Sequence, residues 1–182
     1  AADIGLTLSE DGGANWRRIM QGVEDGDAVE LEISRTNPAT MYLLAIPWLK
    51  KGRVYVYKSY DAGATWEDIG FAVKEIKLLQ KFDFADGLPT NIELDPVDDK
   101  IAYVATNGYG IFKTSDGGAT WKEINTGLLS RCVQGPDALL VHPARPQTLF
   151  VSTQNGGVFK TTDGGERWHR TCAGNYFTFG MA

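Results

Sequence analysis

The chain has 182 residues, a net charge of −5, a pI near 5.0 and 43% hydrophobic residues, which are typical of a globular domain. Its basic residues are scattered, apart from a short cluster at Lys50, Lys51 and Arg53, so the composition excludes an extended nucleic-acid-binding surface. No apolar run reaches the ~18–20 residues that a membrane-spanning helix needs.

The first predicted element is a pair of strands within residues 5–19, joined by the motif SEDGGANW at residues 9–16. Gly13 can take the backbone conformation that a tight turn requires, and Asp11 can accept hydrogen bonds from N–H groups of the turn. Trp16 begins the next strand and can fold over the turn as an apolar plug. The motif residues are therefore predicted to be structural.

Three further copies of this motif follow, SYDAGATW (59–66), TSDGGATW (114–121) and TTDGGERW (161–168). The four aspartates stand at positions 11, 61, 116 and 163, so the steps between them are 50, 55 and 47 residues. A period near 50 with strand-like flanks is typical of β-propeller blades. The same structural roles are predicted for the remaining motif residues: Asp61, Trp66, Asp116, Trp121, Asp163 and Trp168.

The segments between the motifs align as three four-stranded units, at about 29–69, 91–124 and 138–171. Several of their strands alternate apolar and polar residues, as half-buried strands do. The predicted fold is all-β: a propeller of four-stranded antiparallel blades with the motif turn between strands three and four. Its strands are 29–34, 40–46, 53–59 and 65–69, then 91–96, 100–106, 110–115 and 120–124, then 138–143, 148–153, 157–162 and 167–171.

The C-terminal stretch NYFTFGMA (175–182) is apolar and has the character of a second strand. Paired with residues 5–9, it would complete most of the partial first blade and close residues 1–182 as one four-bladed domain. Two alternatives remain open: pairing with a second copy in a larger ring, or an excerpt of a longer propeller. All three outcomes avoid exposed apolar strand edges.

A ligand is predicted to bind where the connections between blades and the loops between second and third strands converge. The longest connection, 70–90, carries apolar residues every three positions from Val73 to Phe82, which predicts a short amphipathic helix. The candidate ligand-binding residues on this face are Trp48, Lys51, Arg53, Asn107, Tyr109, Arg131, Gln154 and Asn155.

Glycoside hydrolysis would need two carboxylates about 5–9.5 Å apart. The acidic residues expected on the ligand side are Asp25, Asp27, Asp83, Asp86 and Asp137, and the alternative interpretation is that each is simply solvated. His142 and His169 are interpreted as structural or surface residues. The sequence predicts no metal site and no cofactor, because no Cys/His cluster has metal-ligand spacing.

The two cysteines flank the last predicted blade, Cys132 before its first strand and Cys172 after its fourth. A meander of four strands returns these two points to one face, so a disulfide is geometrically feasible. Such a bridge would indicate an exported protein, secreted or periplasmic. Two free, half-buried thiols are the alternative.

The four motifs resemble the Asp-box, or bacterial neuraminidase repeat, S/T-x-D-x-G-x-T-W. The copies at 59–66 and 114–121 match nearly every position, whereas Asn15 and Arg167 replace the Thr in the first and last copies. The family that these motifs resemble includes sialidases, xyloglucan-active glycoside hydrolases, sortilin-type receptors and a photosystem assembly factor. Since these proteins share a propeller and not a chemistry, the resemblance implies fold far more strongly than activity.

The predicted function is a non-catalytic binding or scaffold module that recognises a protein or a glycan on its loop face. The alternative is one part of a glycoside hydrolase similar to the xyloglucan-active enzymes. A sialidase is disfavoured, because that chemistry needs an arginine trio and only Arg53 and Arg131 are expected on the ligand side.

Overall fold

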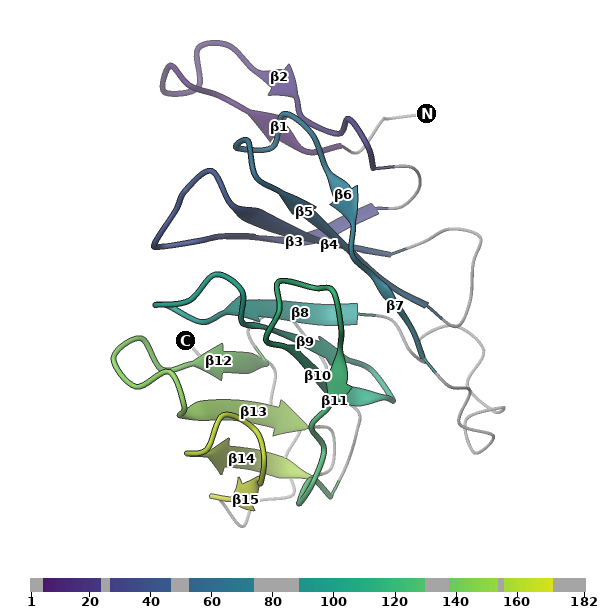
Figure 1. Cartoon of the computed structure of the whole chain (residues 1–182), viewed down its shortest axis with the longest axis vertical. Coiled ribbons are helices and arrows are strands. Elements are labelled where there is room, and N and C mark those ends of the chain that lie inside the picture. Colours follow the sequence, from purple (N-terminus) through teal and green to yellow (C-terminus); the bar gives the residue numbers. More distant parts are fainter. Residues whose placement is uncertain are drawn as a thin grey trace.

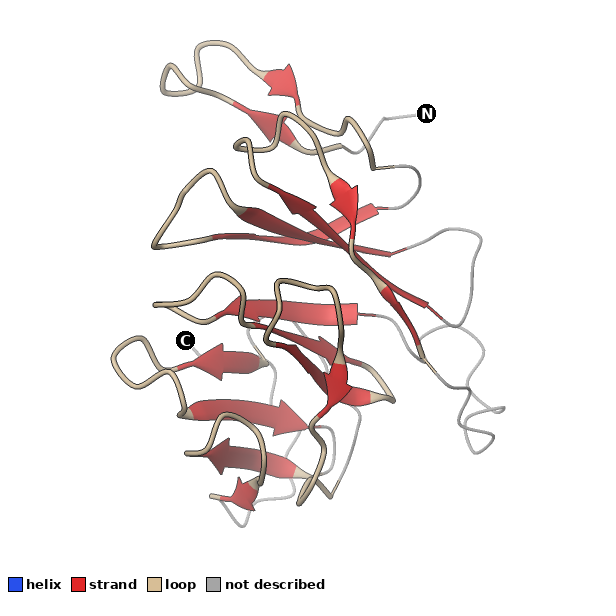
Figure 2. Ribbon diagram, in the orientation of Figure 1, coloured by secondary structure: helices blue, strands red, loops and turns tan. Residues whose placement is uncertain are grey.

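The structure, a computed structural model, describes residues 5–23, 27–46, 53–73, 89–129, 138–153 and 156–171. Within these ranges every regular element is a β-strand, as Figure 2 shows. The strands form one two-stranded sheet and three larger sheets that stand in a row (Figure 1). Each sheet is called a blade below, numbered in chain order. The predicted all-β class is confirmed.

Each blade is an antiparallel meander in which consecutive strands are neighbours. The first blade pairs β1 (Thr7–Leu8) with β2 (Arg17–Arg18). The second contains β3 (Asp27–Ile33), β4 (Met41–Ile46), β5 (Arg53–Ser59) and β6 (Glu67–Asp68), and β7 (Phe71–Ala72) also pairs with β5. The third contains β8 (Pro89–Leu94), β9 (Ala102–Thr106), β10 (Gly110–Thr114) and β11 (Lys122–Glu123). The fourth contains β12 (Leu139–Val141), β13 (Leu149–Thr153), β14 (Gly157–Thr161) and β15 (His169–Arg170).

The strand boundaries differ from the predicted ones mainly at the first and the fourth strands of the blades. β3 and β8 start two residues earlier than predicted, because a register shift at Ala28/Glu30 and another at Pro89/Asn91 carry the pairing past a bulge. The fourth strands are only two residues long. β7 was not predicted: residues 71–72 pair with β5, where the sequence predicts the start of a connection.

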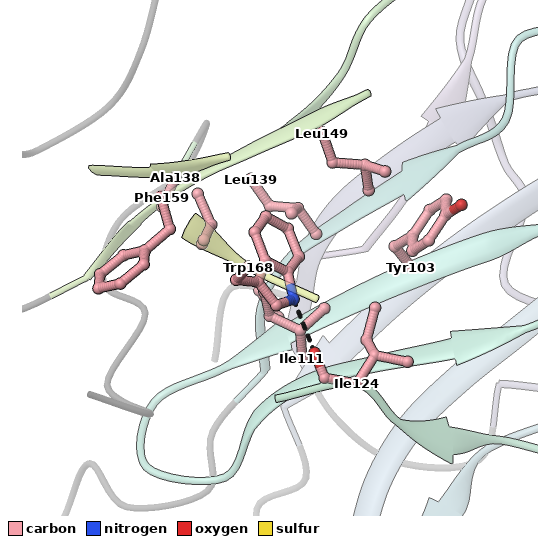
Figure 3. Packing of buried hydrophobic residues seen from close by; sticks show 10 residues of the cluster. Tyr103, Ile111, Ile124, Ala138, Leu139, Leu149, Phe159 and Trp168 are labelled. Atoms are coloured by element: carbon pink, nitrogen blue, oxygen red, sulfur yellow. Dashed lines mark hydrogen bonds between the residues drawn. The ribbon is translucent and has the colours of Figure 1, made fainter. Parts of the chain in front are cut away.

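The core consists of three apolar clusters, each between two successive blades. Alternate residues of one middle strand serve different clusters: Leu43 packs toward the first blade, and its neighbours Tyr42 and Leu44 pack toward the third. β4 and β9 are therefore buried on both faces and carry continuous apolar runs. Figure 3 shows the cluster between the third and fourth blades.

The motif tryptophan joins each blade to the one before it. The indole N–H of Trp66 donates to the Ile19 carbonyl (2.7 Å), and that of Trp121 donates to the Ile69 carbonyl (3.0 Å). Figure 3 shows the third case, Trp168 to the Ile124 carbonyl at 2.7 Å. The sequence predicts an apolar plug over each turn, and a Cβ on Gly63 would lie 3.4 Å from Cζ2 of Trp66. The contact with the preceding blade was not predicted; it arises because the preceding fourth strand ends at the isoleucine and leaves that carbonyl for the next blade.

The second glycine of the motif makes this contact close. Gly118 has a positive φ of 100°, and a Cβ built on it would lie 2.3 Å from Cδ1 of Ile69. Gly165 has the same relation to Ile124, at 2.4 Å. The glycine thus serves the turn conformation and the packing between blades together.

Several sequence predictions lie outside the described residues. They include the pairing of 175–182 with 5–9, the Cys132–Cys172 bridge and most of the helix predicted within 70–90. These stay predictions. The single-domain assignment for residues 1–182 depends on the first of them.

We expect Trp168→Ala to lower the free energy of unfolding by about 3–5 kcal/mol, because it empties a large site between two blades and leaves a carbonyl without its donor. Trp168 is 2% exposed, whereas Trp16 is 63% exposed, and within the described residues its indole donates to Gly13 of its own turn. Trp16→Ala is the matched control, and its cost at low protein concentration should be within about 0.5 kcal/mol. Urea unfolding monitored by circular dichroism measures both; equal costs would contradict the inter-blade role.

Candidate ligand-binding face

The two ends of the blades carry different turns. The Asp-box turns lie beside the turns that join first and second strands: the Ala62 N–H donates to Ala39, that of Gly117 to Lys100 and that of Gly164 to Gln147, all at 2.9 Å. These two kinds of turn form one side of the molecule, called the Asp-box side below. In an antiparallel meander the connections between blades and the turns after each second strand lie at the other end, called the connection side below. The predicted ligand residues belong to the connection side.

Among the predicted ligand residues, the structure describes Arg53, Asn107 and Tyr109. Arg53 is held within its own blade: its Nη2 donates to Oδ1 of Asp68 (2.8 Å) and to the Gly70 carbonyl (3.3 Å). Its guanidinium also lies 5.1 Å from the centre of the Tyr55 ring. A ligand carboxylate would have to compete with Asp68 for this cation. The others lie outside the described residues: Trp48, Lys51, Arg131, Gln154 and Asn155.

The turn that carries Asn107 and Tyr109 is closed by its own bonds. Asn107 is buried, and the Thr106 hydroxyl donates across the turn to the Gly110 carbonyl at 2.9 Å. Asn125 donates to the Tyr109 carbonyl, also at 2.9 Å, and the Tyr109 ring packs against the cluster between the second and third blades. Both residues therefore support the turn, and only the half-buried Tyr109 offers part of a surface.

Of the five candidate acids, the structure describes only the backbone of Asp27. Asp27 lies at the start of β3, paired with Ile46, and not in a loop as predicted. The bulge after Ala28 accounts for the earlier start of the strand. The other four, Asp25, Asp83, Asp86 and Asp137, lie outside the described residues, so the carboxylate-pair hypothesis stays a prediction.

A different set of polar residues, which sequence reasoning missed, links the first strands of successive blades. Glu30 of β3 accepts hydrogen bonds from the Asn91 side chain and from the Ile92 N–H of β8. Asn91 in turn accepts from the Leu139 N–H of β12 at 2.8 Å. The first strand is the edge of each blade, so its outward N–H groups lack a strand partner, and the preceding blade supplies one. The available signal was the polar residue at alternate positions of VELEIS and NIELDP.

Glu93 is the most perturbed acid of this set. It accepts from the Val141 N–H at 3.4 Å and lines a small hollow of about 30 Å³, room for about one water molecule, together with Glu32, Arg35 and Asp95. Burial raises the pKa of Glu93 to about 8; the negative charges of Glu32 and Glu30 add to the rise, and the Val141 N–H and Arg35 oppose it. The hollow is too small for a sugar or a peptide.

The Asp-box carboxylates are engaged in their own turns. Asp116 Oδ1 accepts from the Thr120 N–H at 2.9 Å, and the hydroxyls of Thr120 and Thr114 also donate to its carboxylate. Hydrogen bonds from Thr120 and Thr114 lower the pKa of Asp116 to about 2. Asp61 has the same arrangement with Thr65, Ser59 and a pKa of about 2. Asp11 has the same arrangement with Ser9 and Asn15. The Asp163 carboxylate accepts from the Thr161 hydroxyl and the Arg167 N–H, because Arg167 replaces the Thr of the other turns. A carboxylate held by two or three donors of its own turn is poorly placed to act on a substrate.

The two histidines lie away from the connection side. His142 follows β12, and its Nδ1 accepts the Ala144 N–H at 3.1 Å, so it caps the turn to β13. His169 lies exposed in β15. No cluster of three or more potential metal ligands occurs among the residues that the structure describes. Those residues also contain no helix long and apolar enough to span a membrane.

Comparisons with known proteins give a family and a fold. The sortilin–Vps10 family model (Sortilin, neurotensin receptor 3) matches residues 54–175. The vacuolar protein sorting/targeting protein 10 of Fusarium vanettenii is 33% identical over 92 residues, which cover 50% of this chain and 5% of that protein. The chain thus matches only a small part of the curated relative's length.

Two solved structures share the architecture at low identity. The GH74 xyloglucanase from Xanthomonas campestris gives a TM-score of 0.68 at 17% identity, over 94% of this chain and 28% of that one. YCF48 bound to D1 peptide gives a TM-score of 0.52 at 15% identity, over 82% of this chain and 40% of that one. These likenesses confirm the fold as blades of a β-propeller and carry no statement about chemistry.

We expect Asp116→Asn to lower stability near neutral pH and to have little effect near pH 2. The folded-state pKa of about 2 lies below the usual 3.8, so the carboxylate stabilises the fold above pH 4, and this contribution is lost as pH falls through 2. Urea unfolding of wild type and variant between about pH 2 and 7 measures the difference. A difference that did not shrink on acidification would contradict the turn's dependence on the ionised carboxylate.

We expect Glu93→Gln to raise stability at pH 8–9 and leave it nearly unchanged near pH 4. The raised pKa means that folded Glu93 keeps a proton that the unfolded chain releases, so wild type loses stability as pH rises from about 4.5 to about 8. Glutamine fills the same volume and can still accept the Val141 N–H. The gain at high pH should be on the order of 1–3 kcal/mol, because the hollow is partly solvated. Glu67→Gln, on an exposed fourth strand, is the control; an equal gain there would contradict the assignment.

Proposed function

Because this chain belongs to the sortilin–Vps10 family, we propose that it is a non-catalytic binding module that recognises a protein segment on its connection side. The family match carries the proposal, and the Vps10 relative is named for protein sorting and targeting. The coarser part, a propeller of sortilin–Vps10 type, is established above. The ligand and the residues that contact it are the proposed part.

The lengths of the turns support the choice of side. On the Asp-box side, the turns between first and second strands span 34–40, 95–101 and 142–148, seven residues in each of the last three blades. The Asp-box turns of the last three blades, 60–66, 115–121 and 162–168, also have seven residues each. On the connection side the number of residues between second and third strands varies, from six at 47–52 to three at 107–109 and 154–156. Variable loops on a constant scaffold are where binding residues concentrate.

The carboxylates discussed above are engaged in structural hydrogen bonds, and this supports a binding role over a catalytic one. In the described part of the chain, Glu30 and Glu93 accept backbone N–H groups of the next blade, and the four Asp-box carboxylates serve their turns. The glycoside hydrolase alternative is supported by fold likeness at 17% identity, which does not extend to substrate. Its candidate acids and the glycan ligand are therefore treated as alternative outcomes of one experiment.

Selection of a random 12-residue peptide library on the immobilised chain, followed by interferometry of the selected peptides, tests the proposal. We expect Trp48→Ala and Arg131→Ala on the connection side to weaken peptide binding by at least about tenfold, the usual effect of losing an aromatic or Arg anchor. Val97→Ala and Arg145→Ala, on exposed turns of the Asp-box side, are the controls and should change binding less than about twofold.

A glycan array and a reducing-sugar assay with xyloglucan run in parallel. Glycan binding without peptide binding, or release of reducing ends that Asp83→Asn abolishes, would contradict the proposal. Peptide binding that is lost in the Asp-box-side variants and kept in the connection-side variants would place the site on the Asp-box side and contradict the proposal.

A further inference from the structure

In the second and third blades, the third strand extends beyond the two-residue fourth strand on the connection side. In the second blade the main chain covers this extension, because β7 pairs with Arg53 and Val54 of β5 in the register that β6 began (Figure 1). In the third blade the main chain turns away after Ile124, and the Leu128 N–H donates to the Asn125 carbonyl at 3.1 Å. The backbone groups at the start of β10 therefore need another partner.

The side chain of Asn125 is that partner. Its Oδ1 accepts the Ile111 N–H at 2.8 Å, and its Nδ2 donates to the Tyr109 carbonyl at 2.9 Å. A side-chain amide offers the same donor and acceptor as a peptide unit, so Asn125 replaces the backbone of a longer fourth strand. Gly110 makes room for the amide: its φ is 84°, and a Cβ on it would lie 2.1 Å from Asn125 Oδ1. The turn 107–109 is thus locked to the connection that follows β11.

This use of asparagine is particular to the third blade. The residue that follows the isoleucine at the end of the fourth strand is Met20 in the first blade, Gly70 in the second and Asn125 in the third. Neither Met20 nor Gly70 carries an amide side chain, and the Gly70 carbonyl instead accepts from Arg53 Nη2 at 3.3 Å. The Asp-box residues recur in every blade because every blade needs them. Asn125 does not recur, so the repeat itself does not require it.

The connection that carries Asn125 is itself held by the fourth blade. The Trp168 N–H donates to the Thr126 carbonyl at 2.9 Å, and Leu128 packs against the cluster between the third and fourth blades. Gly127, at a φ of 94°, lies so close that a Cβ on it would be 2.3 Å from the Trp168 carbonyl oxygen. One end of the connection is therefore fixed at a junction between blades, and the other end fixes the turn that carries Tyr109.

The segments 106–111 and 124–129, which this amide joins, contain no charged residue. Tyr109 is half-buried against the cluster between the second and third blades, and Leu129 is 72% exposed. The ligand group that suits such a surface is an apolar side chain. We propose that Asn125 is a positioning residue of the connection side, which holds Tyr109 where an apolar side chain of the protein ligand packs against it. This role rests on the proposed function, because it requires a peptide ligand on that side.

A double-mutant cycle on the full chain, measured by interferometry with peptides selected on the wild type, tests this role. We expect Tyr109→Ala to weaken binding at least about tenfold and Asn125→Ala at least about threefold. The double variant should bind within about twofold of Tyr109→Ala, because Asn125 acts through Tyr109. Asn37→Ala is the matched control: the Asn37 amide also holds a turn, accepting the Ala39 N–H at 3.3 Å, but on the Asp-box side. Its effect should stay within about twofold.

Hydrogen exchange of the ligand-free chain, followed by NMR, measures the contact itself. In Asn125→Ala the Ile111 amide should exchange at least about tenfold faster than in the wild type. The Gly117 amide, bonded to the Lys100 carbonyl on the Asp-box side of the same blade, should change less than about twofold. If thermal unfolding shows that Asn125→Ala is unfolded, Asn125→Asp serves instead. It keeps the acceptor for Ile111 and turns a carboxylate oxygen toward the Tyr109 carbonyl, so the same loss of binding is expected.

Three results would overturn this role while the proposed function stands. They are unchanged exchange at Ile111, peptide affinity within about twofold of the wild type in Asn125→Ala, and losses in the double variant that simply add. A library that yields no peptide able to bind the wild type would contradict the proposed function, and the role of Asn125 in ligand binding would be lost with it.

Discussion

The structure depends on the contact between the motif tryptophan and the end of the preceding blade. A four-stranded sheet with apolar residues on both faces cannot bury them alone, so every blade needs a neighbour on each side. The Trp168 indole meets this need in two ways: its ring fills the cluster between blades, and its N–H satisfies the Ile124 carbonyl. Gly165 lets the two blades approach, because no Cβ stands in the way of the Ile124 side chain. The repeated turn thus also sets the spacing between blades.

The first-strand edge of each sheet must also be covered by a neighbouring blade, and there polar side chains cover it. The first strands of neighbouring blades lie side by side without pairing, and their free N–H groups would be open to another strand. Glu30 and Asn91 occupy those donors from the side. The arrangement carries a cost at Glu93, whose carboxylate is desolvated near two other acids. The blades are therefore held by the apolar clusters between them and by hydrogen bonds between their first strands.

The fold was predictable from the sequence because its information is local and repeated. Each motif contains the complete chemistry of one turn within eight residues, and the repeat period gives the blade. The contacts between blades were not predictable, since Trp66 and Ile19 are 47 residues apart and Glu30 and Asn91 are 61 apart. Arg53 illustrates the same limit for the candidate site. As a cation beside a predicted loop it resembles a ligand contact, but its Nη2 donates to Asp68 at the end of β6, 15 residues away in the sequence.

The division between the two sides follows from what each must do. Turns on the Asp-box side contact their own blade and the preceding one, as Gly117 does through Lys100 and Lys58, so a change in their length would disturb a junction. Among the described residues, the connections on the other side make fewer such contacts between blades. Twice as many residues separate β4 from β5 as separate β9 from β10 or β13 from β14, while the strands of the three pairs keep the same register. A scaffold that fixes one side through inter-blade contacts leaves the other free to vary, and a binding specificity can change there without loss of the fold.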